Sequence, residues 1–289
     1  MADLSFLPDM LLWLPLESFE PRFMRQALLG LMLLCPMTAM LGIAVLNFRM
    51  AFFSDAVGHS AFAGVAVGLI LGAPPNLSMI VFGVIIGLLV MAVQRKSGLS
   101  TDASIGIVFS AVVAFGLAVV SRAANLAREM DKFLYGDILT VSEGEIAALL
   151  CLLAALVIFE ILGANRLLAI SLSPLMARVS GTRVAFWQYL FAALLALVVM
   201  FGVRAVGVLL VTAMLIVPAA TARNLARDMR GMFWWAIAIS CASGFYGLWL
   251  SAQDWVATAS GATIILVACA FFALSVPIGV MHGVRGRAR

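Results

Sequence analysis

Nine long apolar runs, separated by short polar connections, constrain this sequence to a fold that crosses a membrane many times. A helix of about 20 apolar residues spans the hydrocarbon core of a bilayer. Only 11% of the residues are charged, whereas soluble domains carry about 25%. We therefore predict an all-α polytopic membrane protein with about nine transmembrane helices, eight to ten being possible. The predicted spans are residues 26–46, 50–72, 76–94, 102–121, 144–164, 184–202, 205–222, 231–251 and 258–281.

The two ends of the chain fall outside the predicted transmembrane domain, which we place at residues 25–281. Residues 1–24 contain three prolines and are too interrupted to span a bilayer, so an interfacial segment is predicted there. Residues 282–289 form a short basic tail. Inside the domain, only the turn Phe201–Arg204 separates the sixth predicted span from the seventh.

The distribution of positive charge predicts how the chain is oriented in the membrane. About two thirds of the 18 Lys and Arg residues fall in loops on one side of the predicted spans. Cytoplasmic loops carry the excess of Lys and Arg. The N-terminus is therefore predicted outside, and the C-terminus in the cytoplasm.

The second predicted span carries an ionisable pair. Asp55 and His59 stand four residues apart, so a helix places them on one face, roughly 6 Å apart at Cβ. Ionisable groups inside a bilayer are expensive and indicate a functional site. Imidazole with carboxylate suits Zn²⁺, and also Mn²⁺ or Fe²⁺. The residues alone favour a metal site and a structural role about equally. In the structural role, Asp55 caps the helix and His59 bonds a neighbouring helix.

The surroundings of this pair add two expectations. A helix that starts near Met50 would place His59 ~14 Å along its axis, close to the bilayer midplane. Small residues recur every four positions on the adjacent stripe, which would let neighbouring backbones approach closely. These small residues are Ala56, Ser60, Gly64 and Gly68.

The longest loop on the basic side contains a helix signal. Ser173 is a typical N-cap, and Pro174 suits the first helical position. Gly181 is a plausible residue for the position after the helix end. We predict a short cytoplasmic helix at Pro174–Ser180, presented either to a partner or to lipid headgroups.

Three other features bear on a pathway. The short apolar run 133–139 is predicted to be either a re-entrant segment, with Tyr135 and Asp137 facing a pathway, or an ordinary turn. Pro218 should bend the seventh span. Glu160 lies four residues before the predicted end of its span, so its carboxylate is expected to snorkel to the interface.

Several function classes lack their motifs. No G-x-x-x-x-G-K-[ST] sequence occurs, which argues against nucleotide hydrolysis by a P-loop. No G-x-S-x-G or H-E-x-x-H sequence indicates intramembrane catalysis. The net charge of +4 resides mostly in short loops and does not suggest nucleic acid binding. The chemistry that the sequence offers is binding and passage.

Four motifs resemble the membrane subunits of bacterial metal-ion ABC importers, those for zinc, manganese or iron. They are RMAFFSDAVGHSAFAGVAVGL at 49–69, FLYGDILTVS at 133–142, ISLSPLMARVSGTRV at 170–184 and LLVTAMLIVPAATARNLAR at 209–227. The first motif, as it stands in this sequence, is more similar to the zinc branch of the family than to the manganese branch. The resemblance implies a multi-pass protein of the bacterial cytoplasmic (inner) membrane.

The same resemblance implies partners and roles. Two copies would form the pathway as a homodimer, and two separate ATPase subunits would dock on the cytoplasmic face. The helix at Pro174–Ser180 would be the coupling helix, with Ala177 and Gly181 matching the family's A-x-x-x-G. An extracytoplasmic binding protein would deliver the metal, and Asp55 and His59 would face the translocation path.

The sequence therefore predicts a transport subunit that is not itself an enzyme. It would move a divalent transition metal, with zinc favoured, by alternating access, and would hold no permanent cofactor. Manganese or iron(II) stays an alternative cargo within the same family. An ion-coupled secondary metal transporter is a further alternative, although no internal repeat of the kind that such transporters carry is visible.

Overall fold

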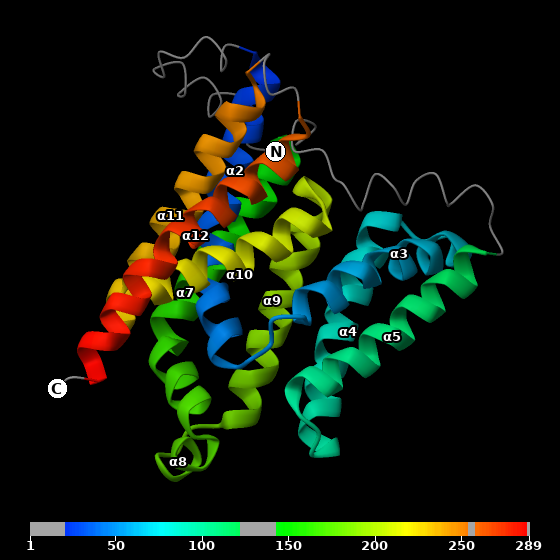
Figure 1. Ribbon diagram of the computed structural model, residues 1–289. Coiled ribbons are helices and arrows are strands. Elements are labelled where there is room, and N and C mark those ends of the chain that lie inside the picture. Colours follow the sequence, from blue (N-terminus) through cyan, green and yellow to red (C-terminus); the bar gives the residue numbers. More distant parts are fainter. Residues whose placement is uncertain (1–20, 122–142, 254–257, 288–289) are drawn as a thin grey trace. The chain divides into compact units, whose positions relative to one another are not determined.

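The computed structural model describes residues 21–121, 143–253 and 258–287, and these residues form helices joined by short links (Figure 1). Nine of the helices in the described part are long and apolar enough to cross a membrane. The predicted all-α membrane architecture is thereby confirmed. The helices are α2 (Arg22–Asn47), α3 (Phe53–Leu71), α4 (Pro75–Ser97), α5 (Thr101–Val120), α7 (Glu143–Leu172), α8 (Pro174–Val179), α9 (Val184–Val206), α10 (Val208–Leu225), α11 (Met229–Ser251) and α12 (Ser260–Arg287).

The chain divides into two compact units, each of which is described by itself. One unit comprises residues 44–136 and 156–212, and the other comprises residues 1–43, 137–155 and 213–289. Of the sequence predictions, Tyr135, Asp137 and residues 1–20 of the N-terminal segment lie outside the described residues.

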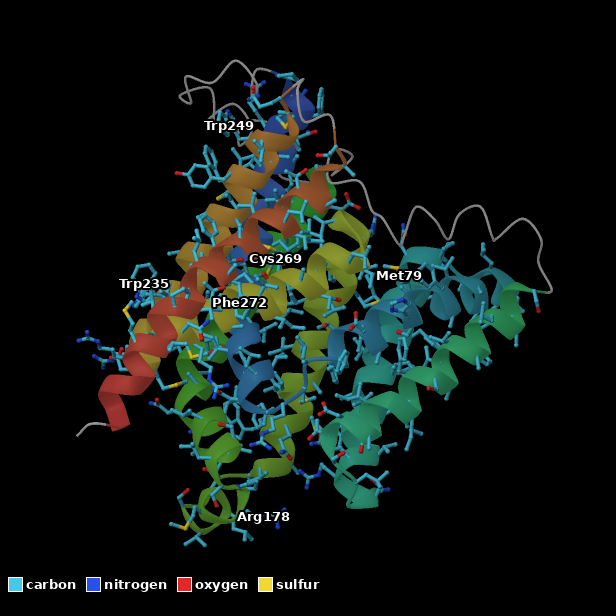
Figure 2. All side chains as sticks on the ribbon, viewed as in Figure 1. Met79, Arg178, Trp235, Trp249, Cys269 and Phe272 are labelled. Carbon is cyan, nitrogen blue, oxygen red and sulfur yellow. The ribbon has the colours of Figure 1, made fainter. Side chains whose placement is uncertain are left out.

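In the first of these units, α3 lies at the centre and packs against α4, α5 and α9. A Cβ on Gly64 would lie 2.9 Å from Met79 Cα, and one on Gly68 would lie 2.5 Å from Ser78 Oγ. Both partners are on α4, where Figure 2 labels Met79. Ala56 and Ser60 are fully buried. The predicted stripe of small residues therefore does bring two helix backbones together.

In the other unit, α11 packs against α12 and also lies beside α2. The Ser240 hydroxyl of α11 donates a 2.9 Å hydrogen bond to the Cys35 carbonyl of α2. A Cβ on Gly247 would lie 2.5 Å from Ile264 Cα of α12. Close packing between small residues and polar contacts of this kind are the usual means by which membrane helices associate.

Among the helix boundaries that differ from the sequence prediction are the break between α9 and α10 and the end of α7. The break between α9 and α10 falls at Gly207, with φ 87° and ψ 162°, and not at the predicted turn Phe201–Arg204. That region of backbone space is open essentially to glycine alone. Helix α7 continues to Leu172, eight residues beyond the predicted end. The prediction stopped early because Asn165 and Arg166 are polar, although both lie inside the helix.

The longer α7 overturns the snorkelling prediction for Glu160. This residue lies twelve positions, or about 18 Å, before the helix end. Its Oε1 atom is buried and has no hydrogen-bond partner among the described residues. One carboxylate oxygen of Glu160 is therefore buried within the protein, farther from the helix end than the sequence predicted.

Candidate functional site

Helix α3 exposes an ionisable pair on an otherwise buried surface. Every residue of Phe53–Ala66 is buried except Asp55 and His59, which are partly exposed. Helix α3 begins at Phe53, so the two residues lie about 3 and 9 Å along its axis, nearer to its start than predicted. A helix that hides its apolar side chains and opens only at a carboxylate and an imidazole is built around those two groups.

The hydrogen bond of His59 determines which ring nitrogen is available. His59 Nδ1 lies 3.0 Å from the backbone carbonyl of Asp55. Because a carbonyl can only accept, Nδ1 carries the proton and donates it. The lone pair of Nε2 is then left for a metal or another donor.

Two phenyl rings fix the plane of this imidazole. The Phe109 ring of α5 meets it edge-on, with ring centroids 5.3 Å apart and an interplanar angle of 88°. The Phe62 ring of α3 makes a similar contact at 6.2 Å. Edge-to-face contacts of this kind hold aromatic rings in defined orientations. The imidazole is therefore oriented from two helices.

A third polar residue completes the local arrangement. The Thr212 hydroxyl, in the second turn of α10, donates a 3.1 Å hydrogen bond to Asp55 Oδ1. Helix α10 approaches α3 closely at Gly58, where a Cβ would lie only 2.9 Å from Val208 Cγ1. The bond orients the carboxylate and leaves its other oxygen, Oδ2, available to a cation. A threonine so placed can orient the carboxylate without touching whatever the carboxylate binds.

Sequence reasoning did not single out Thr212. It lies 157 residues from Asp55 along the chain, and no spacing rule links two residues on different helices. It does fall inside the matched motif at 209–227, which is the one sequence signal that points to it.

The described residues contain no group of three or more His, Cys, Asp or Glu side chains that could hold a metal ion. At this site Asp55 and His59 form a pair of such side chains. Closed structural zinc sites use four ligands. Two such side chains are fewer than a closed site requires.

The predicted cytoplasmic helix is present as α8. The Ser173 side chain accepts a hydrogen bond from the backbone N–H of Met176, which makes it the N-cap, and Pro174 follows at the first helical position. Ala177 is buried. Gly181 has a φ of +79°, as expected for a residue just after a helix end.

The exposed side chains of α8 are mostly apolar. Leu175, Met176 and Val179 are between 72% and 86% exposed, and Arg178 projects beside them (Figure 2). An apolar tip on a capped helix, outside the candidate spans, is a typical contact for another protein. Sequence reasoning found the helix but not this composition of its surface. Pro218 lies inside α10 as predicted, and its role as a gate stays a prediction.

In the described part of the chain, candidate spanning helices that carry an accessible Asp–His pair, with a capped helix between two of them, are typical of polytopic membrane permeases. The chain belongs to the ABC 3 transport family, whose model matches residues 20–279.

Relatives of known name agree with this assignment. The chain is 31% identical to the high-affinity zinc uptake system membrane protein of Haemophilus influenzae, over 86% of this chain and 95% of the relative. It is also 31% identical to a manganese transport system membrane protein of Halalkalibacterium halodurans, over 99% of this chain and 95% of the relative. The structure of PsaBC from Streptococcus pneumoniae in complex with Fab matches with a TM-score of 0.75 and 27% identity, covering 94% of this chain and 95% of that one.

The resemblance to membrane subunits of metal-ion ABC importers is thus confirmed, as is the prediction of a transport subunit without catalytic activity of its own. The protein is a multi-pass membrane permease. The comparisons do not separate zinc from manganese, because relatives of both names match at the same identity.

Proposed function

We propose that this chain is the permease of an ATP-driven importer for a divalent transition metal, with zinc as its cargo. The observation that carries the proposal is the pair of oriented, accessible ligand atoms on α3. Asp55 keeps one carboxylate oxygen available beyond its bond to Thr212, and His59 keeps Nε2 available beyond its bond to the Asp55 carbonyl.

The pair acts as a transient site on the pathway. Two copies of the permease contribute two Asp55 and two His59 side chains, which can approach a tetrahedral set at the dimer axis. The site has to release its ion, so incomplete coordination in one copy suits transport better than a closed site would. Movement of the helices around α3 exposes the ligands first to one side of the membrane and then to the other.

The motor is on other chains. Two ATPase subunits dock on the cytoplasmic face and push on α8, whose exposed apolar tip supplies the contact. An extracytoplasmic binding protein delivers the metal at the opposite face. The excess of Lys and Arg in the loops on the α8 side supports a cytoplasmic position for α8 and the C-terminus, and an outside position for the N-terminus.

Zinc is favoured over manganese by the ligand types and by the resemblance of the first motif to the zinc branch. Imidazole suits zinc, whereas manganese prefers carboxylate, carbonyl and water. The same two residues can bind Mn²⁺ or Fe²⁺, so the preference among ions is a separate question from the transport class.

The class is tested by purifying the permease from native membranes under mild conditions. We expect a P-loop ATPase to co-purify and the reconstituted complex to accumulate radioactive zinc only when ATP is supplied. Zinc uptake driven by an ion gradient, without ATP or an ATPase, would overturn the proposal in favour of a secondary transporter. Competition by unlabelled Zn²⁺, Mn²⁺ and Fe²⁺ then ranks the cargo, and stronger competition by manganese would overturn the choice of zinc.

A further inference from the structure

A second polar site lies in the unit that contains α3, at the level where α7 and α9 approach α8. It is a pocket of about 400 Å³ lined by Arg166, Ser180, Gly181, Thr182, Arg183, Phe186 and Trp187. The two charged residues in this lining are both arginines. The pocket therefore presents two positive charges and two hydroxyl groups, with no negative charge among its lining residues.

The wall of the pocket is closely packed around Trp187. A Cβ on Gly163 of α7 would lie 2.4 Å from Trp187 Cζ3, so α7 and the indole are in close contact. The rings of Phe159 and Phe186 lie 5.8 and 5.9 Å from the Trp187 ring. Trp187 is buried accordingly. Its ring is a fixed surface against which a mobile side chain can be ordered.

One of the arginines is ordered in this way. The Arg166 guanidinium carbon lies 4.9 Å from the centroid of the Trp187 ring, which is within cation–π range. Stacking holds the planar guanidinium in one orientation and leaves its N–H donors available. A guanidinium fork pre-oriented in this way matches the oxygens of a phosphate group.

The second arginine stands where α9 begins. Arg183 is the N-cap residue of α9, and its side chain makes no cap hydrogen bond. The first-turn N–H groups of a helix and the positive end of its dipole favour an anion at this place. The pocket thus combines two guanidinium groups with the start of a helix, and both attract the same kind of ligand.

The surroundings identify the source of the anion. Arg166 lies six residues, or about 9 Å, before the end of the spanning helix α7. On the same helix, Ile161 and Leu162 are strongly exposed, and so is Phe186 at the pocket wall. An apolar surface beside Trp and Arg is typical of the boundary between acyl chains and headgroups.

We propose that this pocket binds the phosphate group of an anionic phospholipid. Arg166 and Arg183 hold the phosphate oxygens, and the acyl chains lie along the exposed apolar surface of α7. A zwitterionic lipid fits less well, because its amine or choline finds no acidic partner in the lining. In the orientation proposed above, this lipid belongs to the cytoplasmic leaflet, and that assignment rests on the proposed function. The binding of the lipid itself does not depend on the transported metal or on the ATPase.

Native mass spectrometry of the full-length permease, released from phosphatidylcholine–phosphatidylglycerol nanodiscs, measures the lipid that remains bound. We expect the wild-type chain to retain phosphatidylglycerol. The double variant R166Q/R183Q should retain about tenfold less, as expected for the loss of charge-assisted hydrogen bonds. The matched control is R178Q/R230Q, which removes the same charge from two exposed arginines outside the pocket and should retain wild-type amounts.

Equal loss of lipid in both double variants would overturn the proposal, because it would indicate general surface charge only. Unchanged retention in R166Q/R183Q would also overturn it. If that variant fails to fold, R166K/R183K keeps the charge, removes the guanidinium forks and should still lose several-fold in retention. Displacement of phosphatidylglycerol by millimolar inorganic phosphate would instead assign the pocket to a soluble anion and overturn the lipid assignment.

Discussion

Three side chains from two helices determine what the α3 site can offer a metal ion. Asp55 Oδ1 accepts from Thr212, and His59 Nδ1 donates to the Asp55 carbonyl. Each residue of the pair therefore uses one polar atom in a hydrogen bond within the protein and keeps another available, which we propose the metal uses. The structural role predicted from the residues alone was wrong in its details: Asp55 does not cap α3, whose N-cap is Phe52, and His59 bonds within its own helix and not to a neighbouring one.

The Thr212 hydroxyl provides the most specific test at this scale. Thr212→Val keeps the shape of the side chain but leaves Asp55 Oδ1 without its donor. We expect the KM for metal uptake to rise by about tenfold, in line with other residues that orient metal ligands. Thr212→Ser restores the donor and should restore the KM. Zinc uptake kinetics of the reconstituted transporter measure both, and a Thr212→Val variant with the wild-type KM would remove Thr212 from the site.

The sequence could predict part of this site and not the rest. Asp55 and His59 are visible because ionisable residues are costly in a membrane and because i and i+4 share a helix face. Thr212 is an ordinary residue in an apolar helix, and its role depends on a contact across 157 positions. Glu160 was misplaced because its depth depends on where α7 ends, which composition alone does not determine.

At the scale of elements, the contact between α3 and α4 fixes the helix that carries the site. Gly64→Ala would place a Cβ 2.9 Å from Met79 Cα and from Phe82 Cβ. Because a backbone atom cannot move aside easily, we expect a loss of about 1–3 kcal/mol in the free energy of unfolding.

A thermal unfolding comparison in detergent checks the Gly64 prediction. Gly106→Ala on α5 is the matched control, since a Cβ there meets nothing within 4 Å. Alanine should be neutral or stabilise α5 by up to about 1 kcal/mol, because it is a better helix former than glycine. Equal melting temperatures for the two variants would contradict the close packing of α3 on α4.

Helix α8 is short enough to depend on its cap. Ser173→Ala removes the side-chain acceptor for the Met176 N–H, which typically costs about 1 kcal/mol. We expect weaker association with the ATPase, measured by co-purification, and recovery in Ser173→Asp. Ser171→Ala, which removes a hydroxyl that bonds only within α7, should have no effect. If Ser173→Ala binds the ATPase normally, the cap is not needed for coupling.

Element positions were largely predictable, and the exceptions have physical reasons. Hydropathy reports which residues prefer lipid, so it locates the centres of spans well. It does not report where a helix ends, and α7 continues for eight residues past the predicted end. The break at Gly207 depends on a backbone conformation that only glycine adopts readily, but the sequence contains 24 glycines and does not indicate which of them breaks a helix.

At the scale of the whole molecule, the proposed orientation makes opposite predictions for two exposed positions. With the four native cysteines replaced, Asn76→Cys at the exposed start of α4 should react with a membrane-impermeant maleimide in intact cells. Arg178→Cys on α8 should react only after permeabilisation. The excess of Lys and Arg on the α8 side is the physical reason. The reverse pattern of labelling would invert the topology and place α8 beyond the reach of a cytoplasmic ATPase.

Asp55 and His59 are proposed to form a transient metal site on the pathway of the permease. The most direct test is the initial rate of ATP-driven zinc uptake by the reconstituted transporter, for variants that assemble normally with the ATPase. We predict that Asp55→Asn and His59→Gln each lower the rate by about tenfold or more, while His282→Gln, which changes the other histidine of the chain, transports normally. Wild-type uptake by both Asp55→Asn and His59→Gln would contradict the account.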